Sequence, residues 1–299
     1  MFESRRARLW SLLGDLPPES PITAETIEVQ QHPGYRLEKL RLDLNGLEPV
    51  PAWLMVPDGL RGPAPAVVFN HSHGGHYDRG KDEFVLGQDY LADPPYCQAL
   101  AAEGYVALAI DAWCFGERAG RSELDTFKRM LWRGQVLWGM MCFDSYRALD
   151  YLAARPEVDA GRIGTLGLSM GCTAAWWLAA LDERIKACCG LVCLTDYEAL
   201  LAHGREACHG IYYYVPGLLK EFGTDDIVRL ICPRAFLSIN GDRDDGTPPE
   251  GVDRVRAAVE PDWARAGAAE RLSILRHDVD HRETPEMRRL VLDWLRRHL

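Results

Sequence analysis

The sequence has no long run of apolar residues and no cluster of basic ones. No segment reaches the roughly 18 to 20 uninterrupted apolar residues of a membrane-spanning helix, so we expect no membrane partner. The 34 lysines and arginines are outnumbered by 44 acidic residues, which gives a net charge of -10. They form no stripe that could follow a phosphate backbone. We therefore expect no nucleic-acid partner either.

Two further absences bear on location. The N-terminal segment lacks the apolar stretch and the small-residue cleavage site of a secretory signal peptide. The nine cysteines are scattered and odd in number, unlike the paired cysteines of a disulfide-stabilised secreted domain. Both observations predict a reduced, cytoplasmic protein.

The chain length and the order of its apolar runs predict a single α/β domain over 1–299. We expect an N-terminal helix and a proline-rich segment within 1–24, followed by three runs typical of antiparallel strands. From Pro65 onward, short continuous apolar runs alternate with helical patterns, as in a parallel sheet covered on both faces. The long connections 74–104 and 195–233 interrupt this pattern and are expected to form site walls or a lid.

A candidate nucleophile lies in the middle of the chain. The segment Gly167–Gly171 fits G-x-S-x-G, in which a serine stands on a sharp turn between a strand and a helix. An apolar run at 163–168 precedes it and a helix-like run at 173–180 follows it, which is the setting that this turn requires. We therefore predict Ser169 as a nucleophile; the alternative is an unreactive serine in a glycine-lined turn.

A serine nucleophile needs a histidine base and an acid that orients the base. In hydrolases with this turn the acid follows the next-to-last strand and the histidine follows the last one. The loop after the run 235–239 offers Asp242, Asp244 and Asp245, and the end of the chain offers His277 and His281. The order alone leaves these choices open.

The developing oxyanion needs two backbone N–H donors, one from Met170 and one from the loop after an earlier strand, here 71–75. That loop also allows a rival interpretation. His71, His73 and His76 are spaced as in the H-x-H-x-D-H motif of zinc hydrolases. A glycine stands where that motif requires aspartate, and the metal alternative leaves the serine, acid and histidine motifs unexplained, so we expect no metal and no cofactor.

Together these motifs resemble the dienelactone-hydrolase-like and acetyl-xylan-esterase-like branch of the α/β hydrolases, over about 50–299. Further segments that resemble this branch are Gly80–Glu83, Ala101–Asp111, Phe115–Arg118, Arg155–Asp159 and Arg162–Gly164. The resemblance implies an α/β-hydrolase fold with a mostly parallel sheet of about eight strands and helices on both faces. It also implies a small-molecule ester as substrate. Dienelactone hydrolases proper carry a cysteine nucleophile, so their lactone substrate does not carry over to a chain with serine at this position.

The resemblance also selects among the candidate site residues. The spacing from Gly241 to Pro248 is similar to the family's G-x-x-D-x-x-x-P loop, which implies Asp244 as the acid, with Asp245 in reserve. The segment that begins at His281 resembles the family's H-x-x-T-P-x-M ending and implies that this histidine is the base. Asp280 departs from the family pattern, which has glycine there.

For the oxyanion site, the family's H-G-x segment implies the His73 N–H as the second donor, with serine in place of the usual glycine at 72. Trp113, His209 and Tyr212 are candidates for lining an acyl or sugar pocket, since aromatic side chains give rigid contact area. Ester hydrolysis is the leading hypothesis. The alternatives are an aminopeptidase-like or amidase-like relative of the prolyl oligopeptidases and a non-catalytic binding protein with this fold. A homo-oligomer is left open.

Overall fold

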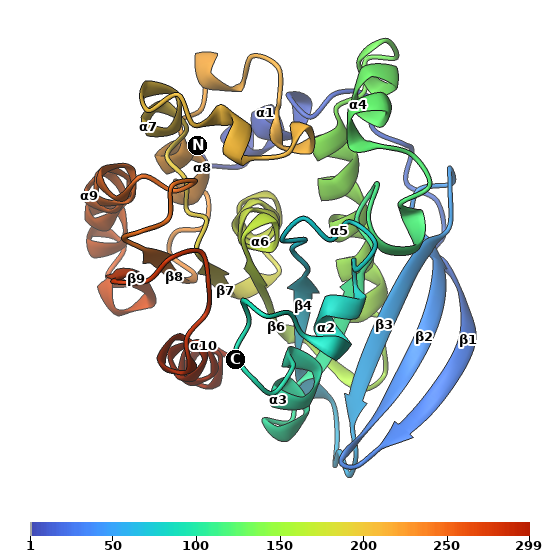
Figure 1. Ribbon diagram of the computed structural model, residues 1–299. Helices are drawn as coiled ribbons and strands as arrows, with labels where there is room; N and C mark the ends of the chain where they lie inside the picture. Colours follow the sequence, from blue (N-terminus) through green and yellow to red (C-terminus); the bar gives the residue numbers. More distant parts are fainter. Residues whose placement is uncertain (1) are drawn as a thin grey trace.

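The computed structural model describes residues 2–299, and its central feature is one mixed sheet of nine strands (Figure 1). The strands lie in the order β1-β2-β3-β5-β4-β6-β7-β8-β9. They are β1 (Thr23–His32), β2 (Tyr35–Asp43), β3 (Val50–Pro57), β4 (Ala64–Asn70), β5 (Val106–Ile110), β6 (Val158–Leu168), β7 (Ile185–Leu191), β8 (Ala235–Gly241) and β9 (Leu272–His277).

The α-helices are α1 (Phe2–Ser11), α2 (Asp82–Leu86), α3 (Tyr96–Ala102), α4 (Glu123–Leu131), α5 (Leu137–Ala153), α6 (Met170–Leu181), α7 (Tyr197–Ala202), α8 (Thr224–Arg229), α9 (Pro249–Arg265) and α10 (Pro285–His298). Single 3₁₀ turns lie at η1 (Gly116–Arg118), η2 (Glu206–Cys208), η3 (Ile211–Tyr213), η4 (Leu218–Lys220) and η5 (Ala269–Arg271). The long helix predicted from residue 136 to 154 is α5.

The pairing confirms the predicted change from antiparallel to parallel strands. β1, β2, β3 and β5 pair antiparallel, and all pairs from β5 to β9 are parallel. The α/β-hydrolase fold expected from the sequence is therefore present, with nine strands rather than about eight. The long strand β1 lies at the edge of the sheet beside β2, and most of its residues are exposed on both faces.

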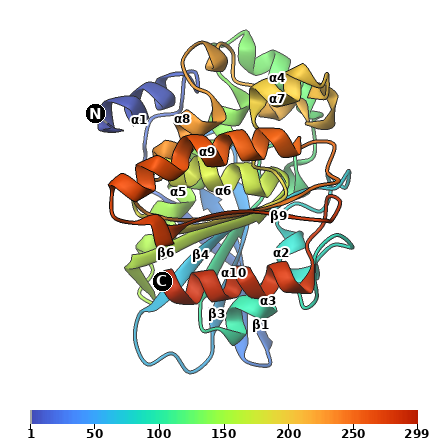
Figure 2. The same ribbon diagram turned by 90° about the vertical axis from the view of Figure 1, so that its left-hand side faces the viewer.

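Helices cover both faces of the sheet (Figure 2). α6 and α9 lie above the sheet in that view, whereas α3 and α10 lie below it, and each face has its own buried apolar cluster. Among residues 2–299, no helix has the length and apolar character needed to cross a membrane.

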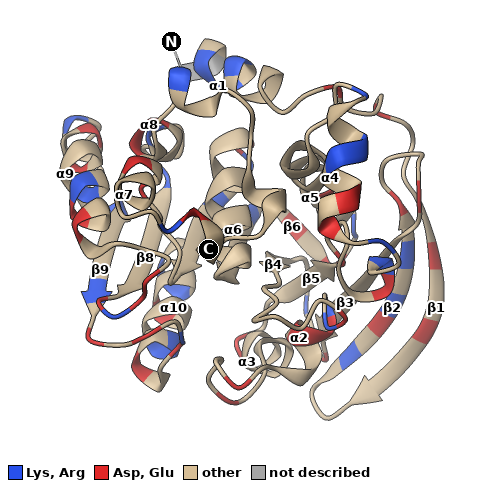
Figure 3. Ribbon diagram, turned by 45° about the horizontal axis from the view of Figure 1, so that its top comes forward, with Lys and Arg blue, Asp and Glu red and all other residues tan. Residues whose placement is uncertain are grey.

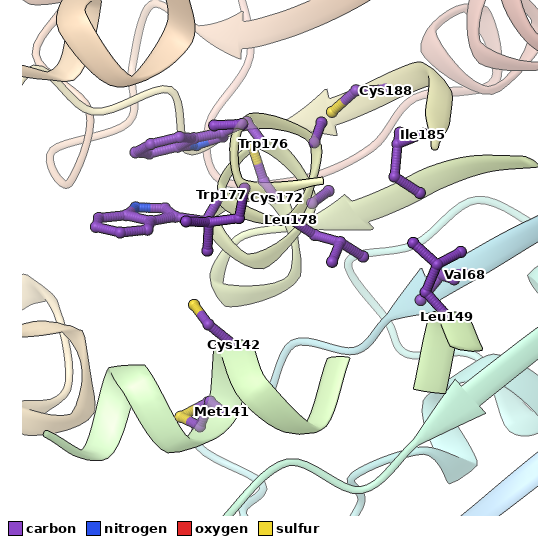
Figure 4. Packing of buried hydrophobic residues seen from close by; sticks show 14 of the residues in the cluster. Val68, Met141, Cys142, Leu149, Cys172, Trp176, Trp177, Leu178, Ile185 and Cys188 are labelled. Carbon is purple, nitrogen blue, oxygen red and sulfur yellow. The ribbon is translucent and has the colours of Figure 1, made fainter. Parts of the chain in front are cut away.

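Helix α6 lies in the middle of the larger cluster. Its sequence contains no charged residue, whereas acidic and basic side chains lie on outer elements such as β1, β2 and α9 (Figure 3). Trp176 and Trp177 are buried, and the second of these rings meets Trp138 of α5 edge-on at 6.1 Å between ring centroids. Cys142 of α5 points toward α6 (Figure 4), and Met141 belongs to the same cluster. Packing on all sides fixes the start of α6, and therefore the serine that precedes it.

Candidate active site

Ser169 lies on a strained turn between β6 and α6. Its backbone has φ +58° and ψ -122°, a region that residues with a side chain rarely adopt. A Cβ on Gly167 would lie 2.2 Å from the carbonyl oxygen of Gly171, and a Cβ on Gly171 would lie 2.0 Å from that of Asn70. Both glycines of the motif are therefore required by close backbone contacts around the serine.

The structure brings the three predicted residues of the serine machinery together. Oγ of Ser169 lies 2.7 Å from Nε2 of His281, and Nδ1 of the same ring lies 2.7 Å from Oδ2 of Asp244. A carboxylate beside Nδ1 places the ring proton there, which leaves Nε2 free to accept the hydroxyl proton of the serine. The other carboxylate oxygen of Asp244 accepts the N–H of Gly246 at 3.0 Å, so the buried acid is held from two sides.

The pKa of His281 reflects two opposing influences. Partial burial lowers the pKa, while the hydrogen bond and the negative charge of Asp244 raise it. The net pKa of His281 is raised above its ordinary value of 6.5. The imidazole side chain is 43% exposed, so it can exchange protons with water and contact a bound substrate.

The competing acids of the same loop point elsewhere. Asp242 pairs with Arg276 at 2.6 Å, and Asp245, exposed, pairs with Arg205 at 3.2 Å. The unusual Asp280 forms an ion pair with Arg282, which lowers the pKa of that carboxyl. The structure thus brings Asp244, and neither of its two neighbours, to the base.

The two predicted oxyanion donors follow neighbouring strands of the sheet. Met170 is the first residue of α6, and His73 lies in the loop after β4, which pairs with β6. Within residues 2–299, neither backbone N–H donates a hydrogen bond to another protein group. The N–H of Ser72, the residue before His73, differs from these two, because it donates to a carboxylate oxygen of Glu83 at 2.9 Å.

The imidazole nitrogens of the two loop histidines are occupied by protein partners. Nδ1–H of His71 donates to the carbonyl of Ser72 at 2.7 Å, and its Nε2 accepts the N–H of Ala112 at 3.1 Å. In His73, Nδ1 accepts the N–H of Gly75, and Nε2–H donates to the hydroxyl of Tyr212, each at 3.0 Å. Burial lowers the pKa of both rings to about 4, so both are neutral near pH 7.

The predicted lining residues occupy different places. Tyr212, in η3, bonds to the His73 ring, and His209 donates from Nε2 to the carbonyl of Gly246 at 2.9 Å in the acid loop. Burial lowers the pKa of His209, but contacts with Cys193 and that carbonyl raise it overall. Trp113 is 9% exposed, and the guanidinium of Arg118 lies 4.4 Å from its ring centre. Their roles in substrate binding stay predictions.

Two features of the site could not be read from the sequence. Val192 has φ +48°, which is unusual for a β-branched residue, and it directly follows Leu191, whose carbonyl accepts the N–H of Ser169 at 2.9 Å. The second is the buried carboxylate of Glu83. Its segment carries a family resemblance, but no spacing pattern links it to Ser72.

Three comparisons place the chain among known proteins. It is 46% identical over 299 residues to the protein named "Putative hydrolase YtaP" of Bacillus subtilis (strain 168), with all of both chains covered. The acetyl xylan esterase from Paenibacillus sp. R4 superposes with a TM-score of 0.66 and 21% identity, covering 100% of this chain and 93% of that one. The glucuronoyl esterase from Solibacter usitatus superposes with a TM-score of 0.68 and 17% identity, covering 98% of this chain and 91% of that one. At such low identities these two structures show the fold alone. The model of the Abhydrolase family matches residues 9–288, and the chain therefore belongs to this family of α/β hydrolases.

Proposed function

We propose that this protein is a serine hydrolase that cleaves carboxylic esters through an acyl-enzyme. The observation that carries the proposal is the unbroken line of hydrogen bonds from Ser169 through His281 to Asp244, with 2.7 Å in each step. These distances lie within the reach of direct proton transfer between the groups.

In the first half of the reaction, the Ser169 oxygen attacks the ester carbonyl carbon while Nε2 of His281 takes the hydroxyl proton. Asp244 stabilises the imidazolium that forms. The N–H groups of His73 and Met170 are the donors for the carbonyl oxygen as it becomes negatively charged. The tetrahedral intermediate collapses when the C–O bond to the alcohol breaks, and the imidazolium gives its proton to the departing alkoxide oxygen.

In the second half, a water molecule attacks the acyl-enzyme. Nε2 of His281 takes one water proton, the same oxyanion donors act again, and the intermediate releases the carboxylic acid as the proton returns to Ser169. The cycle regenerates the free hydroxyl and consumes one ester and one water. In this scheme the imidazole of His281 carries each proton between the hydroxyl of Ser169, the departing alcohol and the water.

Esters are proposed over amides because two structures that share the fold are named as an acetyl xylan esterase and a glucuronoyl esterase. Short-acyl esters, including acetylated sugars, are therefore the first substrates to try. Faster hydrolysis of aminoacyl amides than of acetyl esters would instead favour the peptidase-like alternative.

The decisive experiment replaces the nucleophile. We expect Ser169→Ala to lower kcat on p-nitrophenyl acetate by about 10⁴-fold or more, and to abolish labelling by a fluorophosphonate probe. Ser20→Ala removes the same hydroxyl from a half-buried position in the segment before β1 and should behave like the unmodified protein. Substantial activity or labelling in Ser169→Ala would refute the proposal, and an unmodified protein that neither reacts with the probe nor turns over esters would favour a binding role.

A further inference from the structure

The loop that carries the proposed oxyanion donor is held at one residue, Ser72, from three directions. Its N–H donates to Oε1 of Glu83 at 2.9 Å, and its hydroxyl donates to Oε2 of the same carboxylate at 2.7 Å. Its carbonyl oxygen accepts Nδ1–H of His71 at 2.7 Å. Ser72 and Glu83 are both fully buried.

These contacts determine where the next N–H points. The peptide between Ser72 and His73 is trans, so its C=O and N–H point in opposite directions in one plane. Because the His71 ring holds the carbonyl on one side, the His73 N–H faces the other side. The N–H of Ser72 itself is already engaged by Glu83 and cannot serve an oxyanion.

Glu83 is an unusual group to bury. No basic side chain lies within ion-pair distance of it among residues 2–299, and its partners are the two groups of Ser72 and the hydroxyl of Tyr90, at 2.6 Å. Burial raises the pKa of Glu83, and the hydrogen bonds from Tyr90 and Ser72 lower it in part. A buried carboxylate without a cation costs free energy, and such groups cluster at functional sites.

The support behind this carboxylate is also rigid. Glu83 lies in the short helix α2, next to the loop after β4 (Figure 1). The residue before α2, Lys81, donates its N–H to Oδ1 of Asp111 at 2.7 Å, and the His71 ring accepts the N–H of Ala112. Helix α2 and the loop after β4 are therefore both hydrogen-bonded to residues that directly follow β5.

We propose that Glu83 is a positioning residue that holds the Ser72 peptide so that the His73 N–H is aimed at the oxyanion of the reaction. This inference rests on the proposed function, since it assigns a role within the same ester hydrolysis. The carboxylate touches neither substrate nor nucleophile. It acts through the backbone of Ser72, by occupying one N–H and orienting the next.

The test compares three replacements of Glu83. Glu83→Gln keeps the reach and an acceptor oxygen for the Ser72 N–H, Glu83→Asp keeps the charge but shortens the side chain by one methylene, and Glu83→Ala removes both. We expect kcat to fall about 10²-fold in the alanine variant, because a displaced oxyanion donor costs roughly that much. The aspartate variant should resemble alanine, and the glutamine variant should recover most of the loss.

Two readouts separate positioning from damage to the fold. Active-site titration with p-nitrophenyl acetate counts competent sites, so kcat is expressed per titrated site. A trifluoromethyl ketone forms an oxyanion on Ser169, so its Ki should rise by the same factor by which kcat/KM falls, while KM for the ester changes little. Glu38→Gln alters another buried carboxyl, paired with Arg36 on β2, and should leave kcat per site and the inhibitor Ki unchanged.

Each outcome decides the inference. The inference would be overturned by any of three results. These are wild-type kcat per site in Glu83→Ala or Glu83→Asp, an unchanged Ki of the trifluoromethyl ketone despite a lower kcat, or a Glu83→Gln variant as impaired as Glu83→Asp. If Glu83→Ala does not fold, the comparison of kcat per site between Glu83→Gln and Glu83→Asp still decides the inference. Failure of the proposed function gives a different result, since Ser169→Ala would then retain activity whatever the Glu83 variants do.

Discussion

Nε2 of His281 lies 2.7 Å from Oγ of Ser169, although 112 residues separate the two along the chain. Ser169 follows β6 in the middle of the sheet, and His281 lies in the loop after β9 at its edge. The carboxyl ends of parallel strands share one edge, and loops from that edge can meet. The site therefore depends on two loops holding their places relative to each other.

The first prediction concerns pH. His281 accepts a proton only when neutral, and Asp244 raises its pKa, so kcat/KM should rise with pH and reach half its maximum above pH 6.5. The pKa values of His71 and His73 are about 4, so these rings remain neutral across the range of interest. The measurement is kcat/KM for p-nitrophenyl acetate from pH 5 to 9, and a flat profile would contradict a histidine base.

His209 is a second imidazole with a raised pKa close to the acid loop, so it needs its own control. The variant His209→Gln removes this titration. We expect its profile to keep a limb of the same shape, because the limb belongs to His281. Loss of the limb in this variant would show that the titration belongs to His209 and not to His281.

The second prediction tests the acid. One oxygen of Asp244 already accepts the Gly246 N–H, so asparagine at this position would keep its oxygen there and turn its NH₂ toward Nδ1 of His281. Nδ1 would then have to accept, and Nε2 would carry the proton that Ser169 needs to lose. We expect Asp244→Asn to lower kcat by roughly 10³ to 10⁴-fold with little change in KM.

Asp245→Asn is the matched control, because this neighbouring carboxylate is exposed and pairs with Arg205 at the surface. Its kcat should stay within about twofold of the unmodified protein, as for most surface substitutions. A larger loss from the Asp245 change than from the Asp244 change would mean that the wrong carboxylate has been assigned.

The third prediction concerns the turn itself. A Cβ at Gly171 would meet the backbone oxygen of Asn70 at 2.0 Å, and backbone cannot move aside as a flexible side chain can. We expect Gly171→Ala to destabilise the fold by about 3 kcal/mol or more. Gly62→Ala, which meets nothing within 4 Å, should leave stability unchanged or raise it by up to about 1 kcal/mol. Urea unfolding of the two variants measures the difference, and equal midpoints would show that the turn tolerates a side chain.

The order of the motifs along the chain was sufficient to predict the fold and to select Ser169. A strand, a sharp glycine-flanked turn and a helix are local features, and local features can be read from a sequence. The sheet has nine strands, close to the expected number of about eight, and the antiparallel strands β1, β2 and β3 are the three that the sequence predicted.

The choice among acids was harder for a physical reason. Asp242, Asp244 and Asp245 share one turn, and which of them faces the base depends on a few backbone angles and on the arginines nearby. Only the family-like spacing singled out Asp244. The contact between Glu83 and Ser72 could not be found from the sequence, since it joins helix α2 to the loop after β4 through space and no spacing pattern links the two residues.

The last prediction concerns the anchor of the loop that carries the base. Glu283, two residues after His281, is buried and accepts two hydrogen bonds from Arg288 of α10, at 2.8 and 2.7 Å. It also accepts the N–H of Ala92 at 3.0 Å and the hydroxyl of Tyr96, so it joins the 74–104 connection to the C-terminal helix.

Removing one partner of a buried pair leaves the other charge without compensation, so Glu283→Ala should lower the free energy of unfolding by about 3 to 5 kcal/mol. Arg289→Ala breaks an exposed pair with Asp293 on the same helix and should cost less than about 1 kcal/mol. Urea unfolding again measures both. Because Glu283 holds the loop and takes no part in proton transfer, variant molecules that remain folded should keep most of their kcat per titrated site at low temperature. A stable Glu283→Ala protein would show that the pair with Arg288 is dispensable for stability.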